Sequence, residues 1–101
     1  MRSNRDITLE DARELALATL RTFKSSEELV LLEARTIEKP YGWVFFYQSR
    51  RFVETGDVLH ALGGNGPLVI ERDSGRITVL GTARGVEEEL RVFEECLTNR
   101  S

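Results

Sequence analysis

The side chains that could do chemistry in this chain are few, and their spacing limits what they can do. The only histidine, His60, lies three residues after Asp57, and a histidine with a nearby aspartate is one part of a catalytic site. A dyad also needs a nucleophile or a metal within hydrogen-bond reach, and no motif supplies one, so we interpret His60 as a loop residue at a strand edge. The only cysteine, Cys96, has no histidine near it in the sequence, and we interpret it as a small, partly buried hydrophobic residue.

Two other stretches resemble ligand sites. The Gly63–Pro67 loop is rich in glycine like a phosphate cradle, but it lacks the Lys-Ser/Thr ending of a P-loop and precedes a strand pattern rather than a helix. The acids at Glu87–Glu89 and Glu94-Glu95 fan outward on a helix and include no histidine, so they indicate a solvated face. The sequence therefore predicts no catalytic residue, no cofactor and no metal, and we expect the protein not to be an enzyme.

The totals restrict the class of protein. A chain of 101 residues fits one domain, and we predict a single domain over residues 1–101. A net charge of −3 argues against a nucleic-acid partner, which would favour a basic protein. No stretch approaches the roughly 20 apolar residues of a membrane span, and the N-terminus lacks the apolar region of a signal peptide. With a single cysteine and hence no internal disulfide, these features lead us to expect a cytoplasmic protein that binds neither nucleic acid nor membrane.

The element around which the chain is organised is the aromatic stretch Tyr41–Tyr47, Tyr-Gly-Trp-Val-Phe-Phe-Tyr. Its aromatic and β-branched residues favour a strand. Because side chains alternate along a strand, Trp43, Phe45 and Tyr47 share one face, while Val44 and Phe46 share the other. Both faces are apolar, which is typical of a central strand that is covered, at least partly, on both sides.

Local signals predict the elements around this strand. Thr8 is a good N-cap, with Asp11 three residues later, and the apolar positions after it repeat at helical spacing in a narrow, alanine-rich stripe. A second helix is predicted over about residues 86–97, with acids in its first turn. The remaining predicted strands are Leu29–Glu38, an aromatic strand that runs on to about Arg51, and a hairpin of Leu68–Arg72 and Arg76–Leu80 around Asp73-Ser74-Gly75.

This order, α-β-β-β-β-α, predicts an α+β fold: an antiparallel four-stranded sheet with the N- and C-terminal helices packed on it. If the alanine-rich helix faces the bulkiest strand positions, Trp43, Phe45 and Tyr47 are the core set. Helices on one side would leave the other face of the sheet to water. That face carries an apolar group that is typical of an interface, made of Val44, Phe46, Val69 and Leu80.

We expect this face to bind a partner. Aromatic residues at the centre of an interface tend to contribute most to affinity, so Phe46 is the candidate hot spot. Gly64 and Asn65 belong to a glycine-rich loop that would lie at the rim. An alternative stays open, in which Phe46 is buried beneath a helix or a loop.

Several segments together resemble a known family. Tyr41–Tyr47, Glu54–Asp57, Gly63–Ile70 and Asp73–Gly75 occur in this order between two helices, and they are similar to the bacterial immunity protein 35 family over about residues 8–95. The resemblance implies an α+β binding domain without catalysis, from a polymorphic toxin system in which a small cytosolic protein binds and neutralises a toxin. It implies no particular contact residues.

Two hypotheses of function follow. In the first, the protein neutralises a cognate toxin by stoichiometric binding. In the second, it is a general protein-binding or chaperone-like domain, with a homodimer as one of its forms, that holds other chains on the open sheet face. A tight 1:1 complex with one partner would support the first hypothesis, and weak binding to many unfolded clients would support the second.

Overall fold

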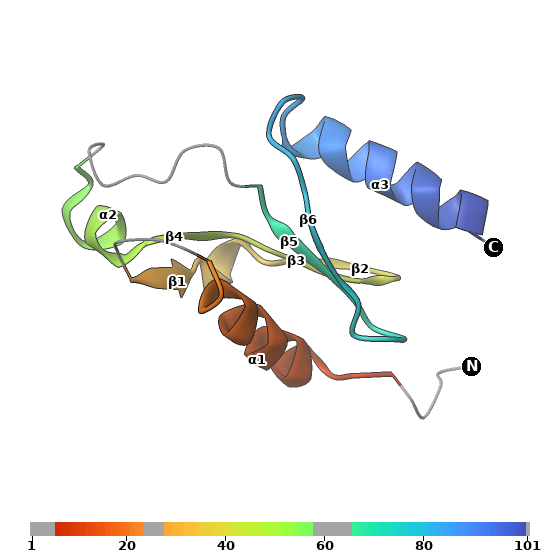
Figure 1. The fold of residues 1–101 in the computed structure, drawn as a ribbon, viewed down its shortest axis with the longest axis horizontal. Helices are drawn as coiled ribbons and strands as arrows, with labels where there is room; N and C mark the ends of the chain where they lie inside the picture. Colours follow the sequence, from red (N-terminus) through yellow and green to blue (C-terminus); the bar gives the residue numbers. More distant parts are fainter. Residues whose placement is uncertain (1–5, 24–27, 58–65, 101) are drawn as a thin grey trace.

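A computed structural model describes residues 6–23, 28–57 and 66–100 of the chain (Figure 1). The elements along the chain are α1 (Leu9–Leu20), β1 (Leu29–Leu31), the 3₁₀ turn η1 (Glu33–Arg35), β2 (Ile37–Lys39), β3 (Gly42–Phe45), β4 (Tyr47–Ser49), α2 (Arg50–Thr55), β5 (Leu68–Glu71), β6 (Ile77–Val79) and α3 (Val86–Arg100). The predicted α+β class is confirmed, with helices near both ends and antiparallel strands between them.

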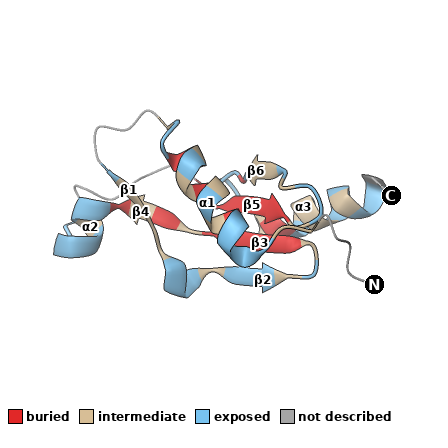
Figure 2. Cartoon of the chain, turned by 90° about the horizontal axis from the view of Figure 1, so that it is seen from below, coloured by how far each residue is buried: buried red, intermediate tan, exposed pale blue. Residues whose placement is uncertain are grey.

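The main sheet is antiparallel and four-stranded, and its strands follow the chain order β2-β3-β5-β6. In the central pair, Trp43 lies opposite Ile70 and Val44 lies opposite Val69. All residues of β3 and β5 are buried, as Figure 2 shows for the middle of the sheet. The predicted hairpin is confirmed, and Gly75 closes it with a φ of 74° that favours glycine. A separate two-stranded sheet pairs β1 with β4 beyond one end of the main sheet.

Helix α1 covers one face of the main sheet (Figure 1). The side chains of Ala12 and Ala16 are fully buried, because their small size lets the helix backbone approach the aromatic residues of the sheet. Trp43, Phe45 and Tyr47 all belong to this cluster, so the predicted core set is confirmed. The expected cap is also present at the start of the helix, as a reciprocal capping box between Thr8 and Asp11 with both hydrogen bonds at 3.1 Å.

Helix α3 covers the opposite face of the same sheet (Figure 1). Its Leu90 and Phe93 pack against Val44, Val69 and Leu80. The expectation that both helices take one side is therefore wrong. The reason is that the central strands are apolar on both faces, so each face needs a helix to bury it.

Residues 29–55 are more broken up than the two long strands predicted there. The first strand ends after Leu31, and η1 intervenes before β2. The aromatic strand divides at Phe46 into β3 and β4, and its expected continuation is the short helix α2. Ser49 caps this helix by accepting a hydrogen bond from the Phe52 amide at 3.1 Å, and Gly56 ends it in the left-handed conformation with a φ of 72°. A serine and a glycine at this spacing are a helix signal that the strand interpretation overlooked.

Candidate partner-binding site

The sheet face that the sequence offered as an open surface is covered. Val44 and Val69 are fully buried and Leu80 is 7% exposed, all beneath α3. The prediction that these residues are exposed to water is wrong, because the apolar stripe of α3 pairs with the very side chains that were expected to be free. A partner that approached this face would first have to displace α3.

Phe46 is only half-buried and lies at the margin of that face. The guanidinium carbon of Arg35 lies 5.0 Å from the centre of its ring, a cation–π distance. The ring borders a cavity of about 250 Å³, to which Pro67 and Val86 also contribute. Its role in partner binding stays a prediction. Gly64, Asn65 and also His60 lie outside the described residues.

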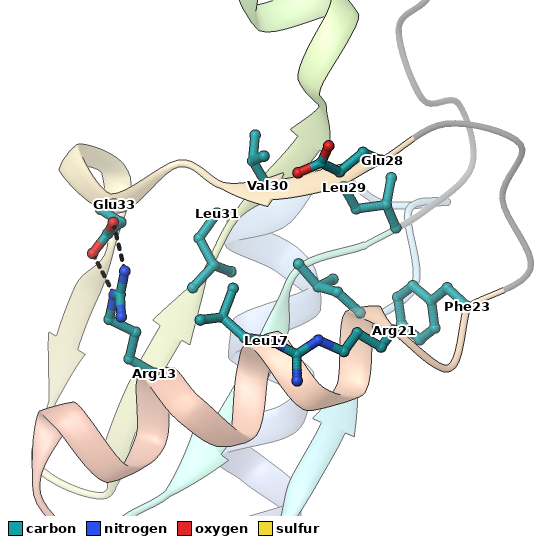
Figure 3. A pocket seen from close by; sticks show the side chains of 10 residues that line it. Arg13, Leu17, Arg21, Phe23, Glu28, Leu29, Val30, Leu31 and Glu33 are labelled. Carbon is teal, nitrogen blue, oxygen red and sulfur yellow. Dashed lines mark hydrogen bonds and ion pairs between the residues drawn. The ribbon is translucent and has the colours of Figure 1, made fainter.

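A larger hollow lies between α1 and β1 (Figure 3). We call it the α1–β1 groove. It has a volume of about 510 Å³ and is lined by Arg13, Leu17, Leu20, Arg21, Phe23, Glu28, Leu29, Val30, Leu31 and Glu33. Apolar side chains from the helix and the strand meet in the middle, and charged side chains stand at both ends, an arrangement typical of protein interfaces.

The local sequence explains how the groove is built. Leu17 is half-buried on α1, one position along from Ala16, which faces the sheet core. Leu29 and Leu31 point from β1 toward the helix, whereas Val30 points away, as alternation along a strand requires (Figure 3). The three residues of β1 are all half-buried, so the strand keeps apolar surface in contact with water.

Ion pairs occupy both ends of the groove. At one end, Arg13 donates from Nε to Oε1 of Glu33 at 2.7 Å and from Nη2 to Oε2 at 3.2 Å. This bidentate contact lowers the pKa of Glu33 and raises the pKa of Arg13. At the other end, Arg50 donates to Glu28 at 3.1 Å. Arg21 lies along the helix wall of the groove, and among the described residues no ion pair engages it (Figure 3).

The backbone of β1 adds hydrogen-bonding groups to the groove. The amide of Arg50 donates to the carbonyl of Glu28, and the amide of Leu32 donates to the carbonyl of Phe46, both at 2.8 Å. Bonded and non-bonded positions alternate in an antiparallel pair. The backbone N–H and C=O groups of Val30 therefore point toward β4, and those of Leu29 and Leu31 point to the opposite side. Within the part of the chain that the structure describes, no strand pairs with this outer edge.

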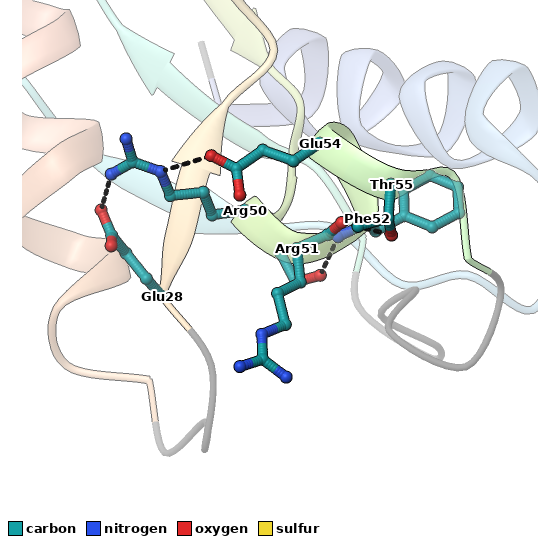
Figure 4. A network of polar contacts seen from close by, with 7 residues as sticks. Glu28, Arg50, Arg51, Phe52, Glu54 and Thr55 are labelled. Carbon is teal, nitrogen blue, oxygen red and sulfur yellow. Dashed lines mark hydrogen bonds and ion pairs between the residues drawn. The ribbon is translucent and has the colours of Figure 1, made fainter.

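Helix α2 extends the polar surface beyond the groove (Figure 4). Arg50 bonds two acids. It donates to Glu28, the residue before β1, and to Glu54, one helical turn later in α2, at 3.2 Å. Arg51 points from the same helix into solvent, away from this network (Figure 4). The network links the start of β1 to α2, next to Leu29, which packs against the hydrophobic core.

The acids and the cysteine of α3 that were considered for chemistry do not line the groove. Cys96 is exposed on α3, so the interpretation of a partly buried residue was wrong. Cys96 does not belong to the cluster in which Leu90 and Phe93 meet the sheet. The acid Glu88 forms ion pairs with Arg91, as a solvated helix face would. No group of three or more potential metal ligands occurs among the described residues.

An α+β chain with a groove that is apolar at its centre and charged at its ends, beside a strand edge with which no described strand pairs, has features found at protein-binding surfaces. The chain belongs to the immunity protein 35 family, whose model matches residues 10–92. It is also similar to the uncharacterized protein YrhB of Escherichia coli (strain K12), with 49% identity over 53 residues. That match covers 52% of this chain and 56% of YrhB, so the chain spans little more than half of this relative's length.

No solved structure matches the chain at a significant level. In the described part of the chain, none of the helices has the length and apolar character needed to span a bilayer.

Proposed function

We propose that this protein neutralises a toxin by binding it tightly in a stoichiometric complex. The observation that carries the proposal is the match to the immunity protein 35 family over residues 10–92. In such a complex, the immunity protein covers a surface that the toxin needs, so the number of bound copies and not a turnover rate determines protection. The proposed partner is therefore a protein, and complementary residues on the toxin would make the binding specific.

The α1–β1 groove is the surface that we assign to toxin binding. It combines apolar side chains that remain accessible with charged residues at its ends, and it is more open than the sheet faces, which α1 and α3 cover. Apolar centres with polar rims supply affinity and specificity in protein interfaces. Phe46 at the margin of the α3 face is the second surface to test, since its ring is only half-buried.

The test is co-expression with the toxin that a neighbouring gene encodes. We expect cells that produce the toxin to survive only with this protein, and the purified pair to run as a 1:1 complex in size-exclusion chromatography with light scattering. Leu17→Glu places a charge in the apolar part of the groove and should abolish both protection and complex formation. Arg51→Glu is the matched control, because Arg51 is exposed outside the groove and its reversal should leave both intact.

Two results would contradict this assignment. If Leu17→Glu protects cells like the original chain while Phe46→Asp does not, the toxin binds at the margin of the α3 face instead of the groove. If the protein binds no toxin but keeps several unrelated unfolded proteins from aggregating, it is a chaperone-like domain. Circular dichroism of each variant is needed to show that a lost effect is not a lost fold.

A further inference from the structure

We infer that the α1–β1 groove binds an extended segment of a protein partner, which adds to the outer edge of β1 as a third strand. The inference deepens the proposed function and rests on it for the identity of the partner, but not for the geometry of binding. It specifies the form in which the partner binds, namely a backbone paired along Leu29–Leu31, and the chemistry of the partner's side chains.

The backbone of β1 is the first reason. The register with β4 directs the N–H and C=O groups of Leu29 and Leu31 to the side opposite β4, where the described residues provide no strand. These are two donors and two acceptors at the spacing of a strand. A helix has its backbone groups bonded internally and cannot satisfy them, whereas an extended segment can.

The groove is the second reason. An added strand would continue the plane of the β1–β4 sheet, and its side chains would alternate between the side of α1 and the side of Val30. Those on the side of α1 would meet Leu17 and Leu31 in the groove (Figure 3). Apolar residues at every second position of the partner segment fit this arrangement, because cross-strand apolar pairs are the units that stabilise a sheet.

Charge specifies one further side chain. Arg13 is engaged by Glu33, and Glu28 by Arg50, so the described charges at both ends of β1 already have partners within the chain. Arg21 has no ion-pair partner among the described residues and lies along the groove wall (Figure 3). An acidic side chain of the bound segment, on the side of α1, would complement it.

The pairing of the acids beside β1 with arginines of the same chain argues against a second copy of this chain as the occupant. A second copy would bring its own β1 to the edge, and the acids that flank that strand among the described residues are Glu28 and Glu33. Both are already bonded to arginines of their own chain, so neither is free for Arg21. A foreign segment with an unpaired acid fits the groove better.

The test uses the full chain and a display library of random peptides about ten residues long, enough to run past both ends of β1 at about 3.3 Å per residue. We expect the recovered peptides to share apolar residues at alternate positions and an acidic residue. Arg21→Glu should weaken their binding by roughly five- to tenfold, while Arg51→Glu, the reversal of an exposed arginine outside the groove, should leave it unchanged. Both side chains are exposed, but Arg21 caps the C-terminal end of α1 and Arg51 lies in the first turn of α2, so circular dichroism of each variant has to show that it is folded.

Two measurements distinguish strand addition from contact by side chains alone. By nuclear magnetic resonance, hydrogen exchange at the amides of Leu29 and Leu31 should slow when a recovered peptide binds, whereas the amide of Val30 should be protected already in the free protein. N-methylation of alternate peptide amides provides the complement. Methyl groups on the amides that face β1 should weaken binding by roughly tenfold each, and those on the intervening amides should have little effect.

Several results would overturn the inference. These are a library that yields no binder, peptides without alternation, or Leu29 and Leu31 amides that exchange at the same rate with and without peptide. Protection of these amides that appears only as the protein concentration rises, with a dimer in solution, would identify a second copy as the occupant. A toxin that is neutralised without any of the expected effects would leave the proposed function standing and reject strand addition alone.

Discussion

Replacing Trp43 by alanine tests the arrangement on which the whole fold depends. Trp43 is 3% exposed at the centre of the cluster beneath α1, next to the small side chains of Ala12 and Ala16. The guanidinium carbon of Arg72 lies 4.6 Å from its ring centre, and Nη2 of Arg72 donates to the carbonyl of Lys39 at 2.6 Å. On one side the ring is covered by α1, whose alanines are too small to fill the space it occupies. On the other side lies Arg72, which is bonded to the backbone at the end of β2.

The magnitude follows from burial and from the limited relaxation of these neighbours. A buried tryptophan removes about 150–250 Å² from water, which at about 25 cal/mol per Å² corresponds to roughly 4–6 kcal/mol for the whole side chain. Alanine retains the first carbon, and measured losses for such truncations are about 3–5 kcal/mol. Because Ala12 and Ala16 cannot fill the space, we expect a value near 4 kcal/mol. Domains are stable by only about 5–15 kcal/mol, so the variant should be marginally folded.

Chemical denaturation followed by far-ultraviolet circular dichroism is the suitable measurement. Trp43 is the only tryptophan, so its fluorescence cannot report on the variant. Trp43→Phe is the matched control and should lose about half as much or less, because a ring still fills the site. A loss below about 1 kcal/mol for Trp43→Ala would refute the reasoning, since it would mean that the ring is not enclosed between α1 and the sheet.

Three further variants test other parts of the structure. Gly66→Ala would place a carbon 1.9 Å from the carbonyl oxygen of Leu80, so we expect it to lose about 1–3 kcal/mol or more in chemical denaturation, and an unchanged midpoint would contradict this close approach. Burial and then the hydrogen bond to Glu94 raise the pKa of Tyr41, so its contribution to stability is full below the ordinary tyrosine pKa of about 10 and is lost as the pH rises above that value. Tyr41→Phe should therefore make stability in urea less dependent on pH in this alkaline range, and an unaltered slope would argue against the contact. Thr8→Ala removes the cap of α1 and should lower the free energy of unfolding by about 1 kcal/mol, with a change near zero showing that the cap does not contribute.

The features that the sequence predicts well are those with a local cause. The capping box of Thr8 and Asp11 needs only residues three positions apart, and Gly75 closes a turn between adjacent strands. The burial of Trp43 follows from alternation along one strand together with the narrow stripe of α1. The cap and the turn lie within a few residues of the signals that specify them, whereas the burial of Trp43 also requires α1, which is distant in the sequence.

The covering of the second sheet face has no such local cause. Apolar residues such as Val44 and Val69 would suit a face that binds a partner as well as a face that α3 covers. Their residue types alone do not distinguish these two environments. The placement of α3 opposite α1 depends on contacts between elements that lie far apart in the sequence. The groove is non-local in the same way, because Leu17 and Leu31 belong to separate elements and neither residue by itself indicates a site.

Which strand edge is available to a partner depends on what flanks each edge. Edges without a partner strand among the described residues include those of β1, β2 and β6. β2 carries Glu38 and Lys39, and charges on an edge strand oppose pairing with another chain. In β6, Val79 is half exposed, and this apolar surface does not line the α1–β1 groove, which would select one partner. β1 is apolar over its three residues, but α1 lies beside it and the acids Glu28 and Glu33 flank it, and charges next to an edge strand oppose the pairing of a second sheet. This combination of an unpaired edge and a restricted approach is what a specific binding site requires, and it is the reason to look for the partner at β1.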